Sequence, residues 1–204
     1  MKDVLARAKE LVNELSELLN KEEKKGDTEL SELAAGEEFY TEIGEFIVLE
    51  QLEGITKVIT KDLYLKDVVF DNTSADYRNS DLKKIFDEKI YEKFCEVFGK
   101  ENIIEHEANL ITVDGQQEYG MTECYVRPLT FDEARKYNDL LVNEDLPDWY
   151  WTCTAWSVPG REWSRSLAVV SPSGYIINLS YVSCNGVRPF CILKSNIFVS
   201  KEEK

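Results

Sequence analysis

The side chains best suited to specific recognition are concentrated in residues 148–165 of this chain. Large aromatic rings beside arginine, serine and threonine are the usual composition of binding hot spots. The rings and guanidinium groups of this segment are Trp149, Trp151, Trp156, Arg161, Trp163 and Arg165. Aromatic residues in such a loop usually anchor it to the core, because tryptophan buries most of its area. The alternative, from which the predicted binding surface follows, is that one or two of these indoles are exposed and face a ligand.

The predicted ligand-binding residues come from this loop and from the segment that follows it. They are Trp151, Trp156, Arg161, Trp163, Arg165, Asn178, Tyr181 and Asn185. A further motif, Gly186-Val-Arg-Pro189, has a structural interpretation. We expect Gly186 to adopt a positive φ and Arg188 to lock the turn by donating to oxygen acceptors. We expect Pro189 to hold the chain extended where it enters a last strand.

Residues suited to acid–base or nucleophilic catalysis give no comparable pattern. His106 is the only histidine, and its neighbours Glu105 and Glu107 indicate a surface position. A dyad of Cys153 with His106 has no local sequence signature. In a chain with 39 acidic residues, any choice of a catalytic carboxylate pair is arbitrary. Because the glycine motifs that cradle phosphates are also absent, the sequence predicts no catalytic residue and no cofactor.

The five cysteines predict free thiols rather than a disulfide framework or a metal site. They are Cys95, Cys124, Cys153, Cys184 and Cys191. Their number is odd and none forms a C-x-x-C pair, which is typical of buried, unpaired thiols. A bridge between Cys184 and Cys191 is disfavoured, and so is a zinc site, since the chain has one imidazole.

Composition limits the classes of partner. The 204 residues are 43% hydrophobic, which is enough for a core, and the net charge is −15. A strongly acidic chain is not expected to bind nucleic acid directly, because such binding needs a basic surface. Acidic surfaces normally serve solubility. The alternative is that the acidic surface imitates nucleic acid toward a basic protein.

The N-terminal segment is predicted to be a separate helix, over residues 1–25. Within residues 2–24, Val4, Ala8, Leu11, Leu15 and Leu18 follow a heptad spacing. This spacing predicts self-association, and the alternative is an amphipathic helix lying across the domain. The segment lacks the apolar core of a signal peptide, and no stretch reaches the length needed to span a bilayer.

The remaining sequence predicts an acidic linker over 26–38, with a short second helix as the alternative for that segment, a domain over 39–199 and a frayed tail over 200–204. Two β-hairpins are expected, one from strands at 46–49 and 56–60 and the other from strands at 167–170 and 175–182. Ser80 is expected to cap one helix, and a Thr130–Glu133 capping box to open a second. Because strands and helices are grouped rather than alternating, we predict an α+β fold with a mainly antiparallel sheet and two helices.

Five short pieces of the chain resemble the prophage-borne family called domain of unknown function 6273. They are Tyr77–Leu82, Arg127–Glu133, Trp149–Trp151, the Val169–Tyr175 hairpin and Asn185–Pro189. The resemblance covers roughly residues 39–195. It implies a C-type-lectin-like fold, similar to that of the formylglycine-generating enzyme. The active-site cysteine pattern of that enzyme and the calcium motifs of sugar-binding lectins are absent, so neither activity is implied.

In the C-type-lectin-like fold, the long loop after the second helix is a variable binding surface. The resemblance therefore implies a phage- or prophage-encoded module that presents an aromatic loop to a protein or a glycan, often as an oligomer. Because the N-terminal segment lacks a signal-peptide pattern, we expect synthesis in the cytoplasm, and a phage origin would allow later association with a virion or release on lysis. The second hypothesis is an acidic inhibitor of a host nucleic-acid-binding enzyme, and the third is a hydrolase with a carboxylate pair.

Overall fold

The computed structural model describes residues 7, 9, 11, 26 and 28–202. Arg7, Lys9 and Leu11 are helical. Apart from these three, the predicted helix over 1–25 and its self-association through 2–24 lie outside the described residues.

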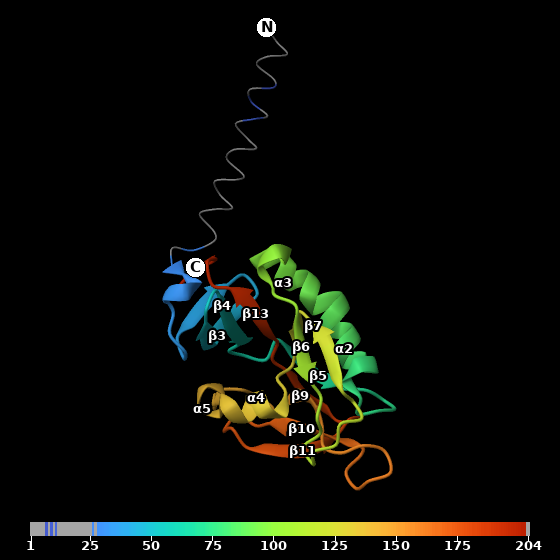
Figure 1. Cartoon of the computed structure of the whole chain (residues 1–204). Coiled ribbons are helices and arrows are strands. Elements are labelled where there is room, and N and C mark those ends of the chain that lie inside the picture. Colours follow the sequence, from blue (N-terminus) through green and yellow to red (C-terminus); the bar gives the residue numbers. More distant parts are fainter. Residues whose placement is uncertain (1–6, 8, 10, 12–25, 27, 203–204) are drawn as a thin grey trace.

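Two five-stranded sheets form the frame of the domain (Figure 1). The first has the order β2 (Glu38–Thr41), β3 (Gly44–Leu52), β4 (Ile55–Thr60), β13 (Phe190–Lys194) and β8 (Val126–Arg127). The second has the order β11 (Ile176–Ser180), β10 (Ser166–Val170), β9 (Tyr150–Ala155), β12 (Cys184–Val187) and β5 (Leu65–Val69). Two-stranded ribbons are formed by β1 (Thr28–Glu29) with β14 (Phe198–Val199), and by β6 (His106–Asn109) with β7 (Met121–Cys124).

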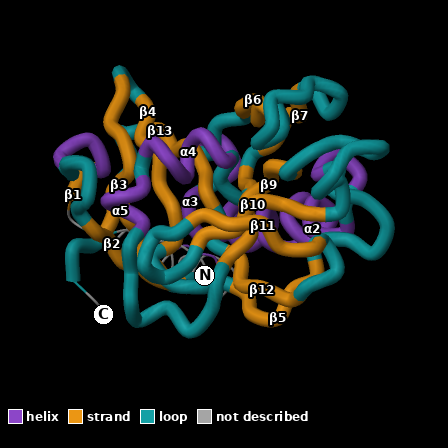
Figure 2. The backbone as a smooth tube through the Cα atoms, turned by 90° about the horizontal axis from the view of Figure 1, so that it is seen from below, coloured by secondary structure: helices purple, strands orange, loops and turns teal. Residues whose placement is uncertain are grey.

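The strand pairs confirm an α+β fold with mainly antiparallel sheets. Every pair within the described residues is antiparallel except β12 with β9, which meet in parallel at Gly186 and Tyr150. The predicted hairpins are confirmed as β3–β4 and β10–β11. In Figure 1, β9, β10 and β11 lie one below the other with β11 lowest, and Figure 2 shows the same strands from below.

Two groups of helices cover the sheets. The first is a continuous helix made of α2 (Asp81–Ile85), a π-helical turn η3 (Phe86–Ile90) and α3 (Tyr91–Phe98). The second is α4 (Phe131–Lys136) with α5 (Asn138–Leu141). Short 3-10 turns lie at η1 (Leu30–Glu32), η2 (Tyr77–Asn79) and η4 (Lys100–Asn102). No helix of residues 28–202 has the length and apolar character needed to cross a membrane.

Both predicted helix starts are confirmed. The Ser80 hydroxyl accepts from the amide of Lys83 at 3.0 Å. The Thr130 hydroxyl accepts from the amide of Glu133 at 3.2 Å, and the Glu133 carboxylate accepts from the Thr130 amide at 2.8 Å. These bonds satisfy amides that the first helical turn cannot pair internally.

The central strands of the sheets are buried on both faces, because each of them contributes side chains to two separate cores. Along β3, Phe46 and Val48 face the core under α2–α3, whereas Ile47 and Leu49 face the core under α4–α5. The same alternation holds in β13 and β9. This explains why these strands appear as continuous apolar runs in the sequence rather than as alternating patterns.

The linker prediction for residues 26–38 is wrong from residue 28 onward. Thr28 and Glu29 pair with β14, and the side chains of Leu30 and Leu33 are fully buried. The acidic composition of the segment concealed these two leucines, which hold it in the core. The predicted frayed tail is attached as far as residue 201, since the Tyr40 amide donates to the Ser200 carbonyl at 2.8 Å and Lys201 pairs with Glu37 at 2.9 Å.

The Gly186-Val-Arg-Pro189 element joins the two sheets. Arg188 is fully buried, and it donates from Nε to the Thr60 carbonyl at 2.9 Å and from Nη1 to the Leu141 carbonyl at 3.0 Å. Its predicted role as a lock is therefore confirmed. Pro189 enters β13 and accepts from the Thr60 amide at 3.0 Å.

The reason expected for a glycine at position 186 is wrong. Gly186 does not have a positive φ. Instead, an added Cβ would lie 2.5 Å from one methyl carbon of Leu63 and 2.6 Å from the other. The residue is glycine because the Leu63 side chain packs directly on its backbone.

We predict that Gly186→Ala lowers the free energy of unfolding by about 1–3 kcal/mol, as other overpacked core positions do. Urea denaturation would measure this. The matched control is the double variant with Leu63→Ala, in which the added methyl group has room. A penalty that is unchanged in the Leu63→Ala background would contradict this explanation.

Candidate binding surface

Residues 156–165, here called the lip, connect β9 to β10 and are fixed at their base. The Trp156 amide donates to the Ser166 carbonyl at 2.8 Å, and the Ser166 amide donates to the Trp163 carbonyl at 3.0 Å. The Tyr181 amide, just beyond β11, donates to the Arg165 carbonyl at 3.0 Å. Figure 1 shows the lip as the orange loop beyond the ends of β10 and β11. The lip is therefore an ordered loop that projects from the ends of β9, β10 and β11.

A second segment supports the lip from the side. The amides of Val113 and Asp114 donate to the carbonyls of Ala155 and Trp156 at 3.1 and 3.2 Å. The Asp114 carboxylate accepts from the Ser157 hydroxyl at 2.7 Å and pairs with Arg161 Nε at 3.3 Å. Although burial opposes ionisation, the hydroxyl bonds and Arg161 hold the pKa of Asp114 below its usual value. Nothing in the sequence marks Asp114 for this role, because Asp114-Gly115 indicates only a turn.

Trp163 is the most distinctive residue of the lip. Its side chain is 60% exposed, and its backbone has φ +62°. A bulky residue in this left-handed region costs on the order of 1–3 kcal/mol and persists only where its surroundings impose it. The lip thus holds an indole in water at a strained position.

Five of the predicted site residues are at or beside the lip. They are Trp156, Arg161, Trp163, Arg165 and Tyr181. Arg161 and Arg165 are exposed, and Trp156 is half-buried. The Arg165 guanidinium lies over the Tyr181 ring at 5.4 Å from its centroid, and the ring itself is buried beneath it. The exposed charged and aromatic side chains of the lip are therefore Trp163 and its sequence neighbours Arg161, Glu162 and Arg165.

The other three predicted site residues do not join this surface. Trp151 is fully buried in β9, where its indole donates to the Val68 carbonyl at 2.8 Å. The prediction that Trp151 faces a ligand is therefore wrong. Asn185 is only 2% exposed, and its Nδ2 has no partner among the described residues. Asn178 lies half-buried within β11, opposite Ala168 of β10.

The misplaced tryptophan follows from a misassigned strand. Residues 150–155 were expected to belong to the aromatic loop, but they form β9, and all six are buried. The segment lacks charge, glycine and proline, and its threonines and aromatic residues favour strands. This composition was a usable signal for a strand. The usual second signal, an alternation of polar and apolar residues, is missing because both faces of the strand are covered.

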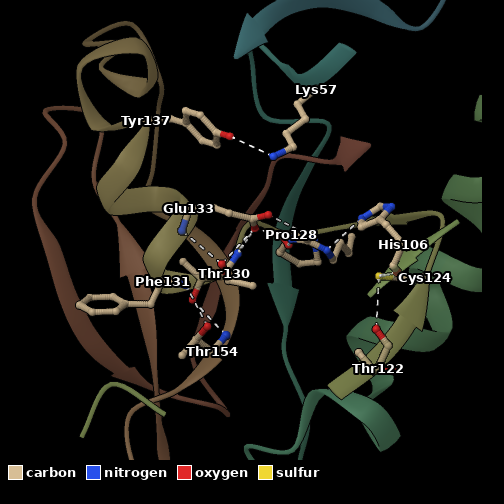
Figure 3. A network of polar contacts seen from close by, with 12 residues as sticks. Lys57, His106, Thr122, Cys124, Pro128, Thr130, Phe131, Glu133, Tyr137 and Thr154 are labelled. Atoms are coloured by element: carbon tan, nitrogen blue, oxygen red, sulfur yellow. Dashed lines mark hydrogen bonds and ion pairs between the residues drawn. The ribbon is translucent and has the colours of Figure 1, made fainter. Parts of the chain in front are cut away.

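A buried polar network lies between the sheets and α4 (Figure 3). Arg127 donates through both terminal nitrogens to the Glu133 carboxylate at 2.6 Å, and through Nε to His106 Nε2 at 3.1 Å. The other imidazole nitrogen, Nδ1, lies 3.0 Å from the Ile104 carbonyl. The ring is therefore neutral, with its proton on Nδ1, because Nε2 accepts.

The electrostatics of this network agree with its geometry. Burial, reinforced by the Arg127 charge, lowers the pKa of His106 from 6.5 to about 4. Burial alone would raise the pKa of Glu133, but Arg127 and the Thr130 bonds hold it at about 2. The surface position predicted for His106 is wrong, because it lies in β6 with its ring partly buried against Phe190.

The network is built for structure rather than proton transfer. Burial raises the pKa of the Cys153 thiol to about 12, and both nitrogens of His106 already have partners. A Cys153–His106 dyad therefore has neither a reactive thiolate nor an available base. The five cysteines are free thiols. No group of three or more histidine, cysteine or carboxylate side chains in the described part of the chain is arranged to hold a metal ion.

Comparison with models of protein families, with curated proteins and with solved structures finds no match for this chain.

We predict that the protein loses about 2 kcal/mol of unfolding free energy between pH 7 and pH 5 because of His106. The folded-state pKa of about 4 lies below the reference value of 6.5, so the unfolded state binds more protons between these values. Stability therefore falls as pH falls through this window. Because His106 is the only histidine, His106→Gln, whose amide oxygen also accepts from Arg127, should flatten the dependence. Denaturation curves showing equal slopes for both proteins would disprove the assignment.

Proposed function

We propose that this protein is a phage- or prophage-encoded binding module with a C-type-lectin-like domain. In this proposal the lip presents Trp163 to a protein or glycan, with Arg161 and Arg165 on either side of it in sequence. The buried frame of two sheets holds the lip in place, and the contact is non-covalent.

The exposure of Trp163 on a strained backbone is the observation that carries this proposal. An exposed indole leaves a large apolar area in water, and its positive φ adds a conformational cost. Neither feature stabilises the folded chain. Both become favourable when a ligand covers the ring, because the lip has already been ordered by Asp114 and by the strands.

The chemistry of the lip favours a ligand with a flat or apolar face and adjacent hydrogen-bond acceptors. The indole can stack on the apolar face of a sugar ring or on an aromatic side chain. Arg161 and Arg165 can donate to hydroxyl, carbonyl or carboxylate oxygens. This composition matches that of interface hot spots, in which tryptophan and arginine are enriched.

We predict that Trp163→Gly abolishes ligand capture while raising the free energy of unfolding by about 1 kcal/mol. Glycine adopts a positive φ without strain, so the substitution removes the ring and the backbone cost together. Capture would be measured on glycan arrays and by pull-down from a bacterial lysate, and stability by urea denaturation.

The matched control is Phe198→Ala, which removes another exposed aromatic side chain, 54% exposed, on β14. The Phe198→Ala variant should still capture every ligand that the Trp163→Gly variant no longer captures. Capture that survives Trp163→Gly, or that is lost equally in both variants, would overturn the proposal for the lip.

A second candidate function, an acidic inhibitor of a nucleic-acid-binding enzyme, is favoured by the β6–β7 ribbon. Residues 101–126 contain six acidic residues and no lysine or arginine. Glu107 and Glu123 are exposed and face each other directly across the two strands. Like charges in this arrangement destabilise a ribbon, and a basic partner would relieve their repulsion.

We predict that Glu107→Gln raises the free energy of unfolding by about 0.2–1 kcal/mol, because it removes this repulsion. Under the second function, the same substitution would weaken capture of a basic protein, and capture would fall steeply with added salt. Glu53→Gln, in the exposed turn between β3 and β4, is the control. Salt-insensitive capture that Glu107→Gln leaves unchanged would exclude this function.

A further inference from the structure

Strand β11 has an unpaired edge. Its inner side pairs with β10, and no strand of the described chain lies on its other side. The Ser171 amide donates to the Tyr175 carbonyl, and the Tyr181 amide donates to the Arg165 carbonyl. Because the backbone groups of alternate residues point to opposite sides, those of Ile176, Asn178 and Ser180 point away from the sheet.

The other edges of the two large sheets are protected. Residue Tyr40 at the β2 edge is bridged by Ser200, and β8 has only two residues and is followed by Pro128. The β5 edge carries exposed Lys66 and Asp67, the latter at φ +55°. Charge, proline, a distorted backbone and short length are the usual means by which proteins prevent edge pairing. In contrast, β11 has five residues, no charge and no proline.

The segment of the sequence that contains β11 also lacks acidic residues. From Trp163 to Lys201 the sequence has no aspartate or glutamate, although the whole chain has 39 acidic residues and a net charge of −15. Two copies of so acidic a protein repel each other over most of their surface. The acid-free segment is where a second copy meets the least repulsion.

One face of β11 is also apolar and exposed. Tyr175, just before the strand, is 72% exposed, and Ile177 is 39% exposed. Leu179, two residues further along the same face, packs partly on the core. An added strand would cover these side chains as well as pair with the backbone.

We propose that β11 pairs with β11 of a second copy of this chain, antiparallel about a two-fold axis at Asn178. This register uses every outward group, because Ile176 pairs with Ser180 of the second copy and Ser180 with Ile176. It also sets Ile177 against Leu179, and Tyr175 against Tyr181. The β11-containing sheet of one copy and the same sheet of the second copy become one continuous sheet. The two lips lie at opposite ends of the paired strands. A dimer of this kind gives a binding module two ligand sites.

The test compares Asn178→Pro with Asn178→Ala in the full chain. Proline removes an outward amide without touching a bond to β10, and edge strands tolerate it. We expect sedimentation equilibrium to show that Asn178→Pro raises the dissociation constant of the dimer by about tenfold or more. Asn178→Ala, which keeps the amide, should dimerise as the wild type does.

A second pair of variants covers the case in which proline disturbs folding. Ile177→Lys places a charge on the exposed face of β11, whereas Leu52→Lys charges an equally exposed site at the end of β3 in the other sheet. Only the first should weaken the dimer. In the wild type, the amides of residues 176, 178 and 180 should become protected from hydrogen exchange as concentration rises.

A wild-type protein that stays monomeric at all concentrations would overturn the proposal. An association that is unchanged in Asn178→Pro and Ile177→Lys, with no concentration-dependent protection in β11, would overturn it as well. That second result would place the contact elsewhere in the chain. Ligand capture by the lip is measured separately, so either proposal can fail without the other.

Discussion

The buried guanidinium of Arg188 is the interaction on which the arrangement of the domain depends. It donates to a carbonyl at the end of β4 in one sheet and to a carbonyl at the end of α5, and it lies 4.9 Å from the ring centroid of Tyr150 in the other sheet. Burial lowers the pKa of Arg188, and no carboxylate of residues 28–202 forms an ion pair with it. Its charge is therefore stabilised by carbonyl dipoles and an aromatic face. Such a site requires all three elements to be in position together.

The buried charge of Arg127 is stabilised in a different way. Its charge is also buried, but it is balanced by Glu133, which opens α4 through the capping box. The Glu133 carboxylate thus caps the first turn of α4 and also balances the buried charge of Arg127. His106 completes the site as a neutral acceptor. The two arginines fix α4–α5 at both ends, and this leaves the opposite end of the β10–β11 hairpin to carry the lip.

Much of the fold could be predicted from local signals. The β3–β4 and β10–β11 hairpins, both helix starts and the lock by Arg188 follow from residue types whose effects extend over a few positions. The failures involve contacts between distant segments. Nothing near Trp151 in the sequence reveals that the Val68 carbonyl accepts from its indole, and nothing near Leu30 shows that its side chain packs in the core. At the lip, sequence reasoning identified Trp163 and its arginines, but the role of Asp114 depends on a contact across the fold.

The β1–β14 ribbon brings the first and last strands of the domain together, with Thr28 directly opposite Val199. A tether attached beyond either residue would therefore pull from the same corner of the molecule. Tension applied there would separate the ribbon one bond at a time instead of shearing several at once. The same closeness would let the domain be carried as an insert within a loop of another protein with little disturbance to its host.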